Sequence, residues 1–286
     1  MNKKVFCAKK FVGERALFMS HDLNLKNCIF VDGESHLKES KNILLDKVCF
    51  QWKYPLWYCD NIHGEDCIFF EMARAGIWYS KNIFLKNCLY EAPKGFRKSM
   101  EIKLENIDFK NALETLWNCK NIVMKDIFAC GDYFCMNSQN IKIKNLNLAG
   151  NYGFDGCDDL EIYDSKILSK DIFWNCKNVK VFNSYISGEY LAWNSENVYF
   201  ENCIIESHQG FCYAKNLVLK NCRLLNTDLA FEYSDVNAEI IGEIESVKNP
   251  ASGIIKADFI NNLILEKDKV DLNKIKIIFG DNKKNV

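Results

Sequence analysis

The chain has 286 residues, of which 37 are basic and 38 acidic, so its formal net charge is −1. This balance provides no global attraction to nucleic acid or to an acidic membrane, and neither is expected as a partner. The length is sufficient for a substantial buried core.

Residues 1–20 are expected to form an N-terminal cap and the first strand. Their sequence, MNKKVFCAKKFVGERALFMS, lacks the continuous apolar segment and small-residue cleavage site of a secretory signal. No stretch of the chain approaches the roughly 18–20 apolar residues of a membrane-spanning helix. A cytoplasmic location is therefore predicted.

Residues 21–237 carry an internal repeat. The phrase KNIFLKNCLY (81–90) returns in variants such as ENVYFENCII (196–205) and KNLVLKNCRL (215–224). We take the second residue of each copy as a marker, and the markers are 19–21 residues apart. They are Asp22, Asn42, Asn61, Asn82, Glu101, Asn121, Asn140, Asp159, Asn178, Asn197 and Asn216. So regular an interval predicts a repeat architecture.

The interior of the repeat predicts its structure. Apolar residues stand one, three, six and eight positions after the marker, as in Ile83, Leu85, Cys88 and Tyr90. This period of two indicates short strands with one buried face. The marker itself and the fifth position after it are mostly Asn or Asp, which tolerate left-handed backbone. The predicted fold is all-β: a single-stranded right-handed parallel β-helix of about 12 rungs, with pectate-lyase-like architecture.

The 19-residue register is lost after Ala238. Residues 238–286 keep an apolar alternation, and we expect them to form the last coils, a C-terminal cap and a tail. A solenoid end exposes unpaired strand edges, and an irregular polar segment is the usual cover.

The 14 cysteines are expected to be reduced, and nine of them occupy two columns that suit a small core residue. Five of them follow a marker by six positions, and four others precede a marker by two. Neighbouring rungs bring pairs such as Cys157 and Cys176 within disulfide range under oxidation. The four histidines are widely separated and no C-x-x-C motif occurs, so no metal site and no cofactor are predicted.

One face of the predicted solenoid combines aromatic and charged residues. Tryptophan recurs four positions before the marker, beside a row of charged residues that is basic over three successive rungs and mostly acidic over the next five. Exposed aromatic arrays bind sugar rings. The predicted ligand-binding residues are Arg74, Trp78, Arg97, Trp117, Trp174, Glu189, Trp193 and Tyr213. The alternative is that the rings stack on one another and only cover the core.

This face predicts binding of an oligosaccharide or a glycoconjugate. An alternative is a glycoside hydrolase, because carboxylates on adjacent rungs would lie about 5 Å apart. Its candidate catalytic residues are Glu114, Asp132, Asp155 and Asp171. A lyase would instead use a basic residue among Lys53, Arg74, Lys94 and Arg97, although no calcium-binding acid cluster accompanies them. A third alternative is a protein-interaction scaffold.

The aromatic and charged segments also carry a family resemblance. They include GERALF (13–18), WKYPLWY (52–58), ETLWNC (114–119), GNYGFDG (150–156), SKDIFWN (169–175) and GEYLAWNS (188–195). In these segments the chain resembles a family of uncharacterised bacterial proteins, common in Firmicutes. The resemblance implies a right-handed β-helix in the cytoplasm, and it supplies no catalytic residues. The sequence DGESHLKES (32–40) departs from it by placing His36 where proline is expected.

Overall fold

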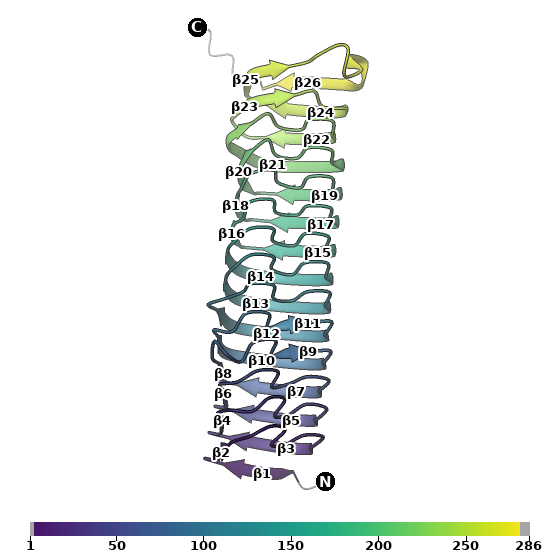
Figure 1. Cartoon of the computed structure of the whole chain (residues 1–286). Coiled ribbons are helices and arrows are strands. Elements are labelled where there is room, and N and C mark those ends of the chain that lie inside the picture. The colour runs from purple at the N-terminus through teal and green to yellow at the C-terminus, as the bar shows by residue number, and fades with distance from the viewer. Residues whose placement is uncertain (1–2, 281–286) are drawn as a thin grey trace. The chain divides into compact units, whose positions relative to one another are not determined.

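The computed structural model describes residues 3–280 and divides the chain into two compact units, residues 1–149 and 150–286. Every strand pairing within each unit is parallel (Figure 1). One short 3-10 helix, η1 (Leu272–Lys274), is the only helix between residues 3 and 280. No helix in this described part has the length and apolar character needed to cross a membrane.

The first unit is a stack of short strands. They are β1 (Lys4–Cys7), β2 (Lys10–Phe11), β3 (His21–Lys26), β4 (Ile29–Phe30), β5 (Lys41–Asp46), β6 (Cys49–Phe50), β7 (Asp60–Glu65), β8 (Ile68–Phe69), β9 (Ile77–Trp78), β10 (Lys81–Tyr90), β11 (Phe96–Arg97), β12 (Met100–Phe109), β13 (Lys120–Cys130) and β14 (Gln139–Ala149). One sheet runs β1, β3, β5, β7, β10, β12, β13, β14, and a second row runs β2, β4, β6, β8. From β10 onward the two rows merge into single long strands.

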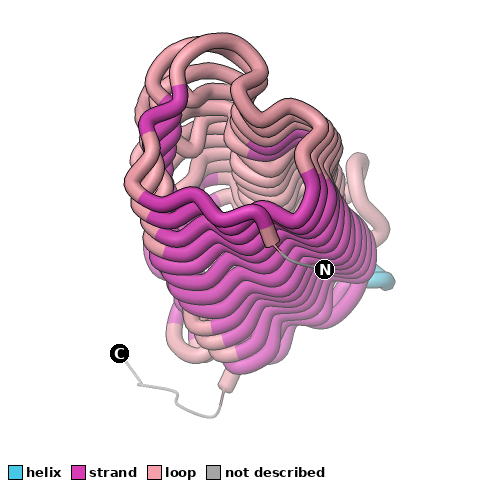
Figure 2. The backbone as a smooth tube through the Cα atoms, turned by 90° about the horizontal axis from the view of Figure 1, so that it is seen from below, coloured by secondary structure: helices cyan, strands magenta, loops and turns pink. Residues whose placement is uncertain are grey.

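The second unit repeats this arrangement. Its strands are β15 (Asp158–Tyr163), β16 (Lys166–Leu168), β17 (Lys177–Phe182), β18 (Tyr185–Ser187), β19 (Glu196–Glu201), β20 (Ile204–His208), β21 (Lys215–Asp228), β22 (Asp235–Ile240), β23 (Glu243–Lys248), β24 (Ser252–Ala257), β25 (Phe259–Ile264) and β26 (Ile275–Phe279). The main row runs β15, β17, β19, β21, β22, β24, β26. Figure 2 shows how successive turns within a unit superpose, with most of the strand segments on one broad side and most of the loops opposite.

The marker residues form the corners that were predicted. All of them have positive φ, for example Asn42 at 57° and Asn178 at 55°, and so do the residues five positions later. Their amides bond from turn to turn: Asn61 Nδ2 donates to Asn42 Oδ1 at 3.0 Å, and Asn197 Nδ2 to Asn178 Oδ1 at 3.0 Å. These ladders satisfy side chains at positions where asparagine also relieves backbone strain.

The interior of each unit is a set of stacked apolar columns. Phe30, Phe50 and Phe69 stack at centroid distances of 5.1 and 5.0 Å in the first unit. Cysteines occupy the narrow columns beside such rings, and burial raises the pKa of the Cys59 and Cys119 thiols to about 12. The structure therefore supports the interpretation that these cysteines fill the core.

The parallel β-solenoid is confirmed, but it has about 15 turns rather than the predicted 12. Residues 4–11 already pair with β3 and β4, and the strands from β22 onward continue the stack after the sequence register is lost. The offset there shortens to 17 residues between Asp235 and Ser252, so strand pairing persists while the spacing changes. Residues 281–286 of the predicted tail, and residues 1 and 2 of the predicted cap, lie outside the described residues.

His36 makes the first unit sensitive to acid. Its side chain is fully buried beside Phe30, and neither ring nitrogen has a hydrogen-bond partner within residues 3–280. Burial lowers the pKa of His36 from 6.5 to about 4, while Asp32 acts in the opposite direction. Because the unfolded chain takes up this proton first, stability is complete above about pH 6.5 and declines as the pH falls towards 4.

The expected loss at pH 5 is about 2 kcal/mol of unfolding free energy. His36→Leu is expected to remove this loss, measured as the urea midpoint at pH 5 relative to pH 7.5. The matched control is His63→Gln, since His63 is exposed on β7. An unchanged pH dependence in His36→Leu would show that other groups cause the acid sensitivity.

Candidate functional site

The loops before each marker residue carry the aromatic residues. The backbone conformation of these loops explains which aromatic side chains are buried and which are half-exposed. In the second unit Asp171, Phe173 and Asn175 all have positive φ, of 54°, 59° and 53°. This alternation leaves Phe173 fully buried and Trp174 half-buried beside it. A left-handed phenylalanine costs about 1–2 kcal/mol, and burial of the whole ring offsets this cost.

The first unit contains a closed stack of side chains, which we call the unit 1 column. Its members are Trp57, Trp78, Arg97 and Trp117. The rings of Trp57 and Trp78 are 5.2 Å apart and nearly parallel, at 6°. The Arg97 guanidinium lies between the next two rings, 4.5 Å from Trp78 and 4.6 Å from Trp117. The inner ring faces are therefore occupied by neighbours in the column.

The polar groups of the unit 1 column are also engaged. The indole N–H groups of Trp78 and Trp117 donate to the backbone carbonyls of Lys94 and Tyr133 at 2.8 and 2.6 Å. Glu114 Oε2 lies 3.0 Å from both Lys94 Nζ and Arg97 Nη2. The prediction that these residues lie together is confirmed. Their polar and charged groups, however, are bound to one another or to the backbone.

Two other basic residues of this row differ from each other. Lys53 Nζ lies 3.5 Å from Glu34 Oε1. Arg74 is exposed and takes part in none of the ion pairs found within residues 3–280.

The second unit carries one aromatic ring on each of four successive turns, and we call these rings the unit 2 ladder. They belong to Trp174, Trp193, Tyr213 and Tyr233. Their consecutive centroid distances are 6.1, 5.0 and 5.5 Å. The rings are tilted by 39°, 47° and 38°, so neighbouring faces are not closed against each other. Tyr213 is 42% exposed. The unit 2 ladder therefore differs from the unit 1 column in the tilt between its rings, whereas the tryptophans of both are half-buried.

Exposed amides flank the ladder. Asn194 Nδ2 donates to Asn175 Oδ1 at 2.9 Å, and Asn175 Nδ2 donates to Asp155 Oδ1 at 3.0 Å. Each asparagine directly follows a ladder tryptophan. Hydrogen-bonding groups thus stand beside the aromatic surface on consecutive turns.

A charged row runs along the same loops. Lys170 Nζ lies 3.0 Å from Glu189 Oε2 and 5.7 Å from the ring centroid of Tyr190. Asp171 is only 2% exposed, and its Oδ1 has no hydrogen-bond partner within the described residues. Burial raises the pKa of the Asp171 carboxyl; Lys170 and a hydrogen bond from Tyr152 oppose this, and Glu189 and Asp155 add to it.

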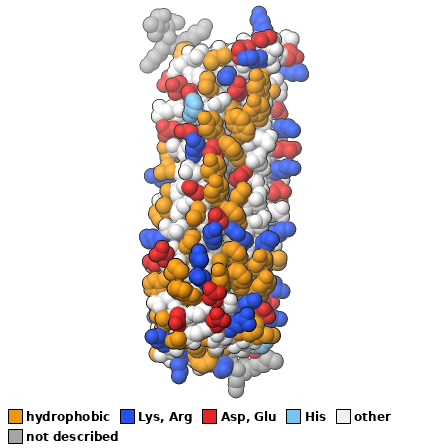
Figure 3. Space-filling model, viewed as in Figure 1, with side chains coloured by type: hydrophobic (Ala, Val, Ile, Leu, Met, Phe, Trp, Pro, Cys, Tyr) orange, Lys and Arg blue, Asp and Glu red, His pale blue; other side chains and the backbone are white. Residues whose placement is uncertain are grey.

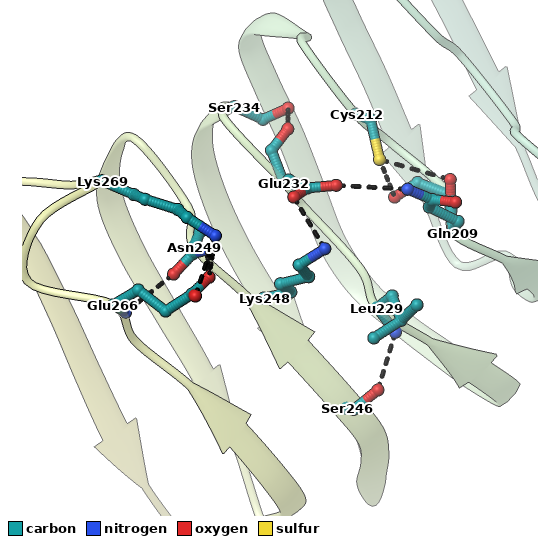
Figure 4. Close-up of polar contacts among 11 residues, drawn as sticks. Gln209, Cys212, Leu229, Glu232, Ser234, Ser246, Lys248, Asn249, Glu266 and Lys269 are labelled. Atoms are coloured by element: carbon teal, nitrogen blue, oxygen red, sulfur yellow. Dashed lines mark hydrogen bonds and ion pairs between the residues drawn. The ribbon is translucent and has the colours of Figure 1, made fainter.

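At the far end of the ladder the tryptophan position is taken by a buried carboxylate (Figure 4). Glu232 Oε1 lies 2.9 Å from Lys248 Nζ, and Glu232 Oε2 accepts from Gln209 Nε2 at 3.1 Å. The backbone carbonyl of Glu232 accepts from Tyr213 N at 2.9 Å, which fixes it beside the ladder. Sequence reasoning missed this cluster, because Lys248 lies beyond the loss of register.

The predicted catalytic carboxylates fall in both units. Glu114 and Asp132 lie on neighbouring turns of the first unit, where Glu114 N donates to the Asp132 carbonyl. Asp155 and Asp171 lie on neighbouring turns of the second. Glu114 is paired with two cations and Asp155 accepts from Asn175, whereas Oδ1 of the buried Asp171 has no hydrogen-bond partner within the described residues.

No group of three or more His, Cys, Asp or Glu residues between positions 3 and 280 is arranged to hold a metal ion. The face in view in Figure 3 shows hydrophobic side chains gathered in patches, with acidic and basic side chains beside them.

Solved structures match the chain over much of its length, but with low sequence identity and low TM-scores. PfbA, a surface adhesin of Streptococcus pneumoniae, is 10% identical with a TM-score of 0.31, covering 92% of this chain and 83% of its own. The catalytic domain of a GH87 α-1,3-glucanase, in complex with tetrasaccharides, is 9% identical with a TM-score of 0.23, covering 94% and 58%. HetL, a pentapeptide repeat protein from the cyanobacterium Nostoc, is 10% identical with a TM-score of 0.22, covering 79% and 86%.

No curated protein matches the chain. A family model described as "Protein of unknown function (DUF3737)" matches residues 4–278. The chain therefore belongs to the DUF3737 family of proteins of unknown function.

Proposed function

We propose that this protein binds carbohydrate through the unit 2 ladder. The observation that carries the proposal is the tilt between Trp174, Trp193 and Tyr213, which leaves ring surface open on consecutive turns. Sugar rings combine an apolar face of C–H groups with peripheral hydroxyls. Aromatic surface accepts the first and hydrogen-bonding groups accept the second.

The surroundings of the ladder support this proposal. Asn175 and Asn194 present amides beside the two tryptophans. Successive turns of a parallel solenoid are about 4.8 Å apart, which is close to the length of one pyranose unit. An oligosaccharide lying along the ladder would place one sugar on each turn.

The test is a calorimetric titration with a panel of β-linked and α-linked oligosaccharides. Trp174→Ala/Trp193→Ala is expected to weaken binding of any ligand at least tenfold, which is about 1.4 kcal/mol. The matched control is Trp57→Ala/Trp78→Ala, which removes two tryptophans from the closed column and is expected to leave affinity unchanged. Equal affinity of the Trp174→Ala/Trp193→Ala protein would contradict the proposal.

A second candidate function is glycoside hydrolysis, and the surroundings of Asp171 favour it. Its raised pKa, caused by burial, suits a general acid, and Asp155 lies on the adjacent turn. Asp171→Asn is expected to abolish product formation from a bound oligosaccharide while the circular dichroism spectrum stays the same. Binding without any product would leave a carbohydrate-binding protein.

The proposal includes a cytoplasmic location. Free buried thiols such as Cys59, Cys119 and Cys176 fit a reducing compartment. The ligand would then be a small saccharide or a glycoconjugate. If no saccharide binds, the ladder is instead proposed to bind a protein partner.

A further inference from the structure

The unit 2 ladder is bordered by an excess of carboxylates. They are Asp155, Asp171 and Glu189 on three consecutive turns of the second unit, and Asp228 and Glu232, which share a later turn. Three have basic partners: Lys170 pairs with Glu189, His208 lies 2.7 Å from Asp228, and Lys248 pairs with Glu232. Asp155 and Asp171 take part in no ion pair within residues 3–280. The corresponding row of the first unit mixes Lys53, Arg74 and Lys94 with carboxylates such as Glu114 and Asp132.

Asp171 provides a second and independent sign of a ligand. A buried polar atom without a hydrogen bond costs free energy, and such atoms are rare in folded proteins. Asp171 Oδ1 is such an atom in a side chain that is 98% buried, since its exposure is 2%. Lys170 and Glu189 both act on the pKa of the Asp171 carboxyl, so a donor group bound beside them would supply the missing hydrogen bond.

The surroundings of Lys170 indicate which kind of hydrogen-bond donor suits the position beside Asp171. Its ammonium lies over the Tyr190 ring and against Glu189, so a carboxylate and an aromatic face already surround a primary amine. Both contacts favour a cation. The Lys170 side chain is 46% exposed, and an exposed ion pair of this kind contributes little stability. A ligand amine can therefore displace it at small cost.

We infer that the unit 2 ladder selects saccharides that bear a protonated amine, and that the ligand ammonium takes the position of Lys170 Nζ beside Glu189, Tyr190 and Asp171. This inference rests on the proposed carbohydrate binding and names its substrate class. The apolar face of the amino sugar lies on Trp174 or Trp193, and its ammonium meets the carboxylates.

The experiment compares three β-1,4-linked tetrasaccharides that differ at one substituent: glucosamine, N-acetylglucosamine and glucose oligomers. Calorimetric titration of the full chain at pH 6 is expected to give at least tenfold tighter binding of the glucosamine oligomer than of the other two. Asp171→Asn and Glu189→Gln are each expected to weaken binding of the glucosamine oligomer at least tenfold, with little effect on the glucose oligomer. Glu114→Gln, in the unit 1 column, is the matched control and is expected to change neither affinity.

Lys170→Met gives the sharpest discrimination. Because it removes the resident ammonium, it is expected to tighten binding of the glucosamine oligomer severalfold, which loss of a purely structural contact would not do. Weaker binding of that oligomer by Lys170→Met would overturn the inference. Equal affinity of the wild-type protein for all three oligomers would overturn the inference but leave the proposed function in place. Absence of binding by any oligosaccharide in the larger panel would overturn both.

Discussion

Lys248→Met is expected to lower the free energy of unfolding by about 3 kcal/mol, because it leaves the Glu232 carboxylate buried with only Gln209 as a partner. The Glu232 side chain is 10% exposed and Lys248 26% exposed, so water compensates for little of the lost ion pair. Urea unfolding followed by circular dichroism measures the change. Hydrogen exchange of residues 229–250 is expected to rise as the local turns loosen.

The control for this effect is Lys256→Met. Lys256 pairs with Glu239 at 3.5 Å on the surface, where both side chains are more than half exposed, so the expected change is below about 1 kcal/mol. Glu232→Leu/Lys248→Met removes both charges and is expected to recover most of the lost stability. If Lys248→Met and Lys256→Met had equal effects, the buried pair would not be the stabilising contact described here.

Phe200→Ala is expected to destabilise the second unit by about 3–5 kcal/mol, because it opens a cavity in a closely packed column. Phe200 is fully buried, and its ring lies 6.3 Å from Phe173 and 5.7 Å from Phe211. The turns above and below cannot collapse into the space without breaking their strand pairing. The urea midpoint measures this loss.

Phe182→Ala is the matched control, because Phe182 lies on the outer side of the neighbouring strand and is only half-buried. Its ring stacks on Tyr163 at 4.9 Å, so its loss is expected to cost about 1 kcal/mol. Phe200→Leu keeps most of the volume and should cost less than Phe200→Ala. An effect of Phe182→Ala as large as that of Phe200→Ala would contradict the assignment of inner and outer faces.

The fold could be read from the sequence because the same physical requirement recurs on every turn. A left-handed corner favours asparagine, and stacking places each corner amide on the previous one, so Asn42, Asn61 and their equivalents report the period directly. The terminal turns lack these amides. β1, β24 and β26 are held in the stack by backbone pairing without an asparagine ladder, and backbone pairing leaves no residue signature.

The candidate site could be predicted only in part. Column membership follows from the period, so Trp78, Arg97 and Trp117 were correctly expected to lie together. Ring tilt depends on the side chains between and beneath the rings, which no single repeat encodes. The closed unit 1 column and the open unit 2 ladder therefore look alike in the sequence and differ in the structure.

Glu232 and Lys248 show a second limit. Their contact joins one regular turn to a later, shortened one, and the change in length obscures which residues face each other. The unpartnered oxygen of Asp171 could not be predicted from the sequence either, since the surroundings of a buried carboxylate depend on residues of other turns, such as Tyr152 and Glu189.

The most direct test of the account is a tryptophan fluorescence titration of two variants with the same oligosaccharide panel. One variant has Trp57, Trp78 and Trp117 replaced by Phe, and the other has Trp174 and Trp193 replaced by Phe. Binding at the unit 2 ladder predicts a saturable change in the first variant, as in the wild-type protein, and no such change in the second. A saturable signal that persists in the second variant and disappears in the first would place the ligand on the unit 1 column and contradict the account.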